Sequence, residues 1–194
     1  EELISFFDRP LHTFARNCLS LSLSPDLTST ESSEPFAVNA LDKYLTRSSF
    51  LEAAGSSDGA ELVSKSTLLS GKLPDNHMVK SELTKWELES IEFHQSIEPY
   101  LPVNANAYSY QVGETILKGE IEQNDDGTNF SYRFGAPKGK DYLGLWVRHL
   151  LANAAQDTSS ITVGVYYQEK SVKERIKTIT FEAVSKEYAL LQLR

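Results

Sequence analysis

The feature that most constrains the fold is a change in the spacing of apolar residues near Asn106. Before it, apolar residues recur every three or four positions, which is the period of an amphipathic helix. After it, several segments alternate apolar and polar residues, which is typical of strands with one buried face. We therefore predict an α/β fold with a mixed sheet flanked by helices, in which residues 1–105 are mainly helical and residues 106–194 form a sheet-containing core.

The helical part is divided by residues that end helices. Asp8 before Pro10 indicates two short helices at the start of the chain, because proline is accepted in the first turn of a helix but not in its interior. Cys18 falls on the apolar stripe of the second of them, so we expect it to be buried. Further helices are predicted over 41–51, 58–70 and 78–97.

The sheet part is predicted to form a hairpin followed by a helix, two strands and a terminal helix. Asn124-Asp125-Asp126-Gly127 supplies residues that tolerate the positive backbone dihedrals of a tight turn. Strands are predicted over 107–112, 115–122, 128–134, 161–167 and 176–181, and helices over 141–154 and from 183 onward. We expect one domain over 1–194, and a start at Glu1-Glu2 with an end inside an apolar run indicates a fragment of a larger protein.

Composition limits the classes of function. The chain has 194 residues and a formal net charge of -8, and a free-standing DNA-binding domain usually needs a face rich in lysine and arginine. We therefore expect weak DNA binding by the chain alone. No stretch approaches the roughly 20 apolar residues of a membrane span, and the start lacks a signal-peptide pattern, so a cytoplasmic protein without membrane contact is expected.

The sequence carries no recognisable metal or cofactor motif. A single cysteine, Cys18, excludes an internal disulfide and a cluster held by four thiolates. The histidines are widely separated and have no partner at zinc-ligand spacing. No glycine-rich phosphate loop and no nucleophile elbow occur. We therefore predict neither a metal nor a cofactor, and no ATP-hydrolysing motor within this chain.

The most basic local cluster lies between the last two predicted strands. It contains Lys170, Lys173, Arg175 and Lys177, close to Tyr167, and basic and aromatic residues together can contact the backbone and stack on the bases of single strands. These five residues are candidate DNA contacts. A solvated connection between two strands is the simpler interpretation.

Several segments resemble, in order and spacing, the C-terminal domain family of RecC, the gamma subunit of exodeoxyribonuclease V. The similarity covers nearly the whole chain. It is carried by Phe6-Phe7-Asp8-Arg9-Pro10-Leu11-His12-Thr13-Phe14, Leu19-Ser20-Leu21, Glu34-Pro35-Phe36 with Leu41 and Tyr44, Gly71-Lys72-Leu73-Pro74, Gly119-Glu120-Ile121, and Leu145-Trp146-Val147-Arg148-His149-Leu150-Leu151.

The resemblance implies a place in the RecBCD helicase-nuclease, which processes broken duplex ends for recombination. The domain would have a restriction-endonuclease-like fold that has lost its activity. It would dock on RecB-like and RecD-like subunits and help to separate the duplex and guide its strands. It would therefore not be an enzyme by itself.

The resemblance also identifies the positions at which an active nuclease carries its chemistry. Such an enzyme has an acidic residue at the end of one strand and an acid-x-lysine pair on the next, and the carboxylates hold Mg²⁺. Here Glu122 stands at the first acidic position, but Ser131 and Arg133 stand where the acid and the lysine would be. A neutral hydroxyl is a poor replacement for an anionic ligand, and arginine does not give up its proton.

Three interpretations remain open at this stage. The first is a non-catalytic domain with the degenerate positions Glu122, Ser131 and Arg133. The second is an active Mg²⁺-dependent exonuclease, which Asp125 and Asp126 beside the turn keep in consideration. The third is a protein-interaction module that does not contact DNA.

Overall fold

The computed structural model describes residues 2–21, 38–56, 58–71, 73–74, 76–101, 103–169, 171 and 174–193. The chain divides into two compact units. Residues 25–99 form what we call the helical unit, and residues 1–24 with 100–194 form the sheet unit. Glu34-Pro35-Phe36 and Lys72, which contribute to the family resemblance, lie outside the described residues.

The helical unit contains α3 (Ala40–Ala53), α4 (Gly59–Leu69) and α5 (His77–Ile97), as the apolar spacing predicted. Asn39 and Asn76 begin α3 and α5 by accepting hydrogen bonds from backbone N–H groups of the first turn, at 2.8 and 2.9 Å. Such caps satisfy donors that have no partner inside the helix. The buried core of this unit consists of Phe50, Leu73, Val79, Leu83 and Trp86.

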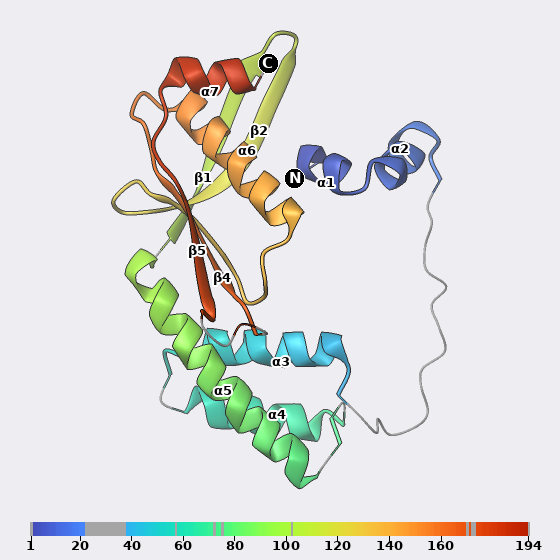
Figure 1. Cartoon of the computed structure of the whole chain (residues 1–194). Coiled ribbons are helices and arrows are strands. Elements are labelled where there is room, and N and C mark those ends of the chain that lie inside the picture. The colour runs from blue at the N-terminus through green and yellow to red at the C-terminus, as the bar shows by residue number, and fades with distance from the viewer. Residues whose placement is uncertain are drawn as a thin grey trace. The chain divides into compact units, whose positions relative to one another are not determined.

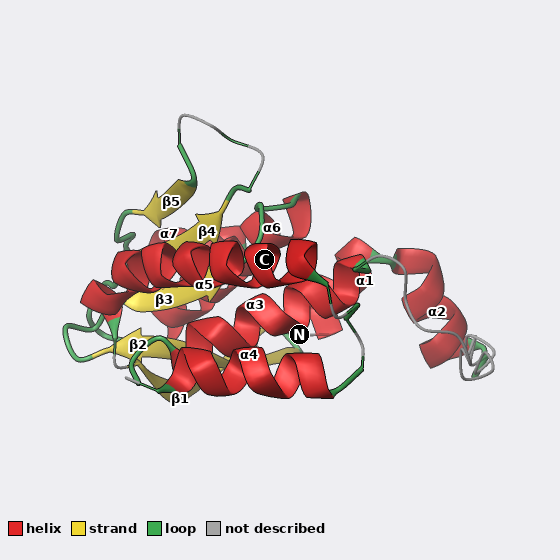
Figure 2. Cartoon of the chain, turned by 90° about the horizontal axis from the view of Figure 1, so that it is seen from below, coloured by secondary structure: helices red, strands yellow, loops and turns green. Residues whose placement is uncertain are grey.

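The sheet unit is built on five strands in sequential order, which are yellow in Figure 2. All neighbours are antiparallel except β3 and β4. Parallel neighbours need a long crossover connection, and α6 (Gly139–Ala155) provides it. The predicted mixed sheet is thus confirmed. The strands are β1 (Val103–Val112), β2 (Thr115–Asn124), β3 (Asn129–Arg133), β4 (Thr162–Tyr167) and β5 (Ile176–Phe181), preceded by the short helix η1 (Glu98–Tyr100).

Helix α6 lies across one face of the sheet, beside α7 (Lys186–Gln192) (Figure 1). Its residues Leu151 and Ala152 pack against Ile121 of β2. Near the end of α6, Leu150 and Ala154 pack against Ala189 of α7, and Ala154 and Ala189 are fully buried. These contacts hold the long β1–β2 hairpin against the helices of the sheet unit.

The chain starts with α1 (Glu2–Asp8) and α2 (Pro10–Cys18), and the break between them falls where Asp8 and Pro10 predicted it. The prediction that Cys18 is buried was wrong, because Cys18 is exposed and neither helix contains a buried residue. Both helices belong to the sheet unit, and α1 packs against α6. An apolar stripe predicts a helix but does not identify what covers it.

Two element boundaries differ from the sequence-based prediction. Strand β1 starts at Val103 rather than Ala107, because its first residues pair with β2, for example Ala105 with Glu122. Pairing therefore overrides the low strand propensity of asparagine and alanine. Helix α7 begins at Lys186 rather than Ala183, since the Ser185 side chain caps it. In the part of the chain that the structure describes, no helix is both long and apolar enough to cross a membrane.

Candidate functional site at the fork between two strands

Strands β2 and β3 are joined by a tight turn, yet they pair at one position only, Gln123 with Asn129. Beyond it they diverge, while β2 stays paired with β1 and β3 with β4. We call the opening between residues 115–122 of β2 and 130–133 of β3 the fork. It contains a cavity of about 600 Å³. Its lining includes Lys118, Glu120, Glu122, Ser131, Tyr132 and Arg148, together with apolar residues of α1 and α6.

The closed end of the fork is fixed by hydrogen bonds of the Gln123 side chain. Its amide nitrogen donates to the carbonyl oxygen of Gly127 at 2.7 Å and to the Asn129 side chain at 3.3 Å. Its oxygen accepts from the Tyr108 hydroxyl at 3.1 Å. Gly127 has a φ of +80°, which glycine adopts without strain. The predicted turn is confirmed, and the side chain beside it determines where the strands separate.

The register places Glu122 and Ser131 on opposite faces of the sheet. Successive side chains of a strand point to opposite faces. Since Ile121 packs against α6, Glu122 lies on the face away from that helix. Ser131 pairs with Gly164 of β4, and a Cβ atom on Gly164 would lie 2.9 Å from Leu145 of α6. Ser131 therefore lies on the α6 face, so the two residues reach the cavity from different sides.

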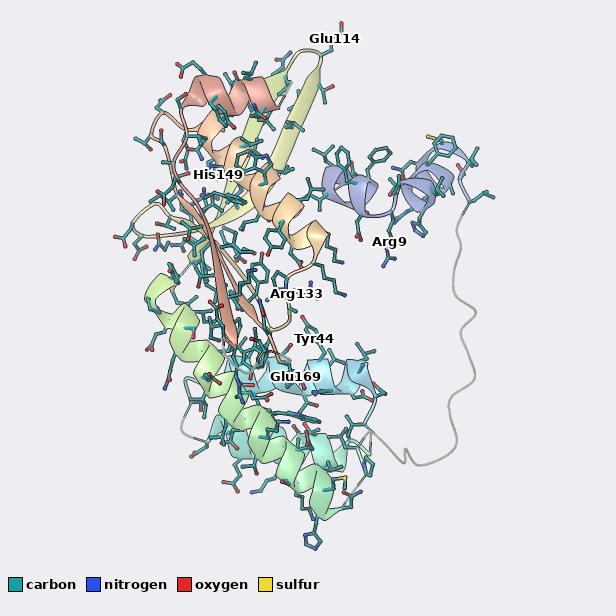
Figure 3. All side chains as sticks on the ribbon, in the orientation of Figure 1. Arg9, Tyr44, Glu114, Arg133, His149 and Glu169 are labelled. Carbon is teal, nitrogen blue, oxygen red and sulfur yellow. The ribbon has the colours of Figure 1, made fainter. Side chains whose placement is uncertain are left out.

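Arg133 lies on the same face as Ser131, but its charge is engaged at the start of α6 (Figure 3). Its Nη1 is 2.6 Å from Oδ2 of Asp141, and both side chains are largely buried. The same carboxylate accepts a hydrogen bond from the backbone N–H of Lys138 at 2.7 Å. Arg133 thus joins the end of β3 to the first turn of α6.

The family positions at the fork do not reproduce the paired carboxylates that hold Mg²⁺ in an active nuclease. Magnesium prefers several oxygen ligands in near-octahedral geometry, usually with one or two carboxylates. Ser131 offers a neutral hydroxyl, and Glu122 approaches from the opposite face of the sheet. Among the described residues, no group of three or more histidine, cysteine, aspartate or glutamate side chains could hold a metal ion.

A second cation, Arg148 of α6, lines the cavity. Its Nη1 lies 3.2 Å from the position that a Cβ atom on Gly144 would occupy, so the missing side chain of that glycine leaves room for the guanidinium group. Burial raises the pKa of Tyr166, Asp141 adds to the rise, and the charges of Arg148 and Arg133 oppose it.

The predicted basic cluster is only partly within the described residues. Lys170 and Lys173 lie outside them. Arg175 is exposed beside the start of β5, and Lys177 is partly buried and pairs with Tyr166.

Tyr167, the aromatic candidate beside that cluster, is buried, with 1% of its surface exposed. Its ring packs edge-on against Phe134, with ring centroids 4.9 Å apart. To stack on a base, the ring would have to leave this packed position.

Below the closed end of the fork, a buried polar network connects α6 to the sheet. The Asn129 side chain donates to the hydroxyls of Ser160 at 2.9 Å and Thr162 at 3.0 Å. The Thr162 hydroxyl lies 2.8 Å from Nδ1 of His149, and Asn153 contacts the same ring nitrogen at 3.3 Å. Every member of this network is buried. The network fixes the position of α6 over β3 and β4, and His149 is labelled in Figure 3.

We predict that acid destabilises the sheet unit through His149, because burial lowers its pKa below the ordinary value of 6.5. As the pH falls through 6.5, the unfolded chain takes up a proton that the folded imidazole resists, so the free energy of unfolding falls. Urea unfolding between pH 7.5 and pH 5 measures this slope. The free energy of unfolding should fall more steeply with decreasing pH in the unchanged protein than in His149→Gln. The control His77→Gln, at an exposed position, should show the same slope as the unchanged protein. Equal slopes in all three proteins would contradict the prediction.

Sequence reasoning missed two residues of the cavity that the structure brings together. Tyr132 lies in the strand predicted over 128–134, and 40% of it is exposed at the fork. Arg148 lies within the helix predicted over 141–154. Gly144, four residues before it, could have indicated the position of its side chain. Residues four apart lie on the same side of a helix, so Gly144 indicates a close approach beside Arg148.

Comparison with protein families gives a match over the whole chain. The model of the RecC C-terminal domain matches residues 1–194. No curated protein matches the chain. A family match of this extent agrees with the ordered segments, from Phe6 to Leu151, that carried the resemblance. The chain therefore belongs to the RecC C-terminal domain family, which gives it a role in the RecC subunit of a RecBCD-type complex, the DNA-processing exodeoxyribonuclease V.

Proposed function

We propose that this chain is a non-catalytic, restriction-endonuclease-like domain that supports the processing of duplex ends by the complex. It would dock on RecB-like and RecD-like subunits in the bacterial cytoplasm. Through that docking and through its own DNA contacts, it would help to separate the strands and guide them. Family membership supports the setting. The arrangement of residues at the fork supports the absence of catalysis.

The observation that carries the proposal is the separation of the degenerate nuclease residues. Glu122 and Ser131 reach the cavity from opposite faces, and Arg133 is paired with Asp141. An active site needs two anionic ligands directed at one cation and a base or lysine beside it. Ser131 and Arg133 depart from that requirement in their chemistry, and Glu122 lies on the face opposite to Ser131, so loss of the metal ion and loss of the base are expected together.

One alternative has an observation of its own. The apolar side chains of α1 and α2 are largely exposed, including Phe7 at 59% and Leu11 at 84%. Exposed apolar surface on a folded domain is typical of contact with another protein. This favours a docking role for the two helices. It agrees with the proposed function, and a pure protein-interaction module would differ from it only in making no DNA contact.

We predict that the chain alone binds DNA weakly, because its net charge is -8. Non-specific binding at physiological salt should have a Kd no tighter than about 10⁻⁴–10⁻⁶ M. Fluorescence anisotropy with single-stranded and duplex oligonucleotides measures it. Charge reversal at Lys173 and Arg175 should weaken the binding further, whereas Arg16→Glu on α2 is the matched control. Tight binding by the chain alone would overturn the view that partner subunits supply most of the affinity.

A further inference from the structure

Three aromatic rings form a stack that ends at the fork. The Tyr100 and Phe130 rings are 4.7 Å apart and nearly parallel, at 11°. Phe130 and Tyr132 follow at 5.8 Å and 29°. Phe130 is 3% exposed and Tyr132 is 40% exposed, and both line the cavity. Tyr132 is thus the more exposed of the two rings that line the cavity, and its ring packs against Phe130.

The two sides of the cavity differ in net charge. Arg148 belongs to α6 and Ser131 to the sheet face that α6 covers, so a positive charge and a hydroxyl lie on one side. Glu120, Glu122 and Lys118 lie on the opposite face, which is also the face of Tyr132, so the residues lining that side carry one more negative than positive charge. A phosphate group is repelled by carboxylates and attracted by a guanidinium group. A nucleotide in the fork would therefore place its phosphate toward α6 and its base toward Tyr132.

The chemistry of the two sides matches the two parts of a nucleotide. Arginine donates paired hydrogen bonds to phosphate oxygens, and a serine hydroxyl can donate one more. An aromatic ring stacks on a base, whatever its identity. The carboxylates beside Tyr132 can accept a hydrogen bond from the amino group of cytosine. The volume of about 600 Å³ falls in the range of small-ligand pockets, which is about 300–1,000 Å³.

We propose that the fork binds one unpaired nucleotide of single-stranded DNA without a metal ion. Tyr132 stacks on the base, and Arg148 with Ser131 binds the adjacent phosphate. The guanidinium group provides the positive charge that a metal ion provides in an active nuclease. This inference rests on the proposed function, because it assigns the DNA contact of that function to particular residues.

Photocrosslinking tests the proposal in the assembled complex of this chain with its RecB-like and RecD-like subunits. The probe is an oligonucleotide with a single-stranded end that carries one 5-iodocytosine, irradiated in EDTA. Mass spectrometry should identify Tyr132 as the crosslinked residue. Tyr132→Ala should reduce crosslinking to this chain about ten-fold, which corresponds to the loss of one stacked base. Tyr188→Ala, which removes an exposed tyrosine of α7, should leave the yield unchanged.

The phosphate contact has its own readout. The logarithm of the crosslinking yield should fall as the logarithm of the salt concentration rises. In Arg148→Gln the slope of this line should be smaller in magnitude by about 0.7, which is the value for one phosphate of a single strand. Arg148→Lys keeps the charge and should keep the slope, and Arg16→Gln is the matched control. An unchanged slope in Arg148→Gln would overturn the phosphate assignment.

The outcomes separate this inference from the proposed function. Crosslinks to other residues of this chain, without Tyr132, would overturn the nucleotide site and leave a DNA-contacting domain. Crosslinks to the partner subunits alone would overturn both and favour the pure protein-interaction module. A Tyr132 crosslink that requires Mg²⁺ would overturn the metal-free site.

Discussion

Replacing Glu89 by alanine should lower the free energy of unfolding of the helical unit by about 3–5 kcal/mol, the usual effect of breaking a buried ion pair. Glu89 of α5 lies 2.9 Å from the guanidinium group of Arg47 of α3, and their side chains are 5% and 8% exposed. The contact is ionic and is not aligned as a linear hydrogen bond. Removing the carboxylate leaves the arginine charge buried without its counterion, which is the origin of the cost.

The matched control removes both charges. Arg47→Met combined with Glu89→Leu replaces the ion pair by apolar side chains of similar volume, which is often neutral or stabilising. Urea unfolding followed by circular dichroism measures the three proteins. The substitution Glu92→Ala, at an exposed position on the same helix, tests whether loss of a carboxylate alone matters. If Glu89→Ala unfolds at the same urea concentration as the unchanged protein, the pair is not a stabilising element of the helical unit.

Replacing Leu151 by alanine should destabilise the sheet unit by about 2–5 kcal/mol, the range for a large buried aliphatic residue. Leu151 is 5% exposed and packs against Ile121 of β2. A Cβ atom on Gly119 would lie 3.1 Å from its Cδ2, so the leucine fits closely over the strand. The variant would leave a void between α6 and β2, and it would enlarge the cavity at the fork, which Leu151 also lines.

The control for this variant is Leu191→Ala, because Leu191 on α7 is 66% exposed. It should change the free energy of unfolding by less than about 0.5 kcal/mol, as surface substitutions usually do. Thermal and urea unfolding of both proteins give the comparison. Hydrogen exchange should also show faster opening of β2 in Leu151→Ala. Equal stability of the two variants would contradict the packing of α6 against the β1–β2 hairpin.

Much of the fold could be predicted because its signals are local. Helix α6 follows from apolar residues at helical spacing, and the turn at Asn124–Gly127 follows from residues that tolerate a positive φ. The five strands and their mixed arrangement were predicted for the same reason. These elements depend mainly on residues close together in the sequence.

The fork could not be predicted, because it depends on contacts between distant residues. The separation of β2 from β3 follows from the pairing of β2 with β1 and of β3 with β4. The face on which Glu122 lies depends on the register of the strands. Matching Glu122 to a family position does not reveal that register. A shift of one residue moves a side chain to the opposite face of a sheet.

Tertiary packing also decided which aromatic residue was accessible. Tyr132 and Tyr167 each fall on the alternating apolar face of a predicted strand, and this alternation does not tell which of the two is exposed. In the structure, Tyr167 is 1% exposed and Tyr132 is 40% exposed. Cys18 is a further example, because its place on an apolar stripe predicted burial and the residue is exposed. Sequence periodicity identifies a face, whereas exposure depends on what covers it.

The central claim, that this domain does not catalyse DNA cleavage, is tested most directly by a nuclease assay on the purified chain. Linear single-stranded and duplex DNA are incubated with it in Mg²⁺ or Mn²⁺, beside a Glu122→Ala control. Losing one of two carboxylates leaves the phosphate charge less compensated, which costs on the order of 10²-fold or more in rate. We predict no cleavage by either protein. Cleavage by the unchanged chain that disappears in Glu122→Ala would contradict the account and establish an active nuclease.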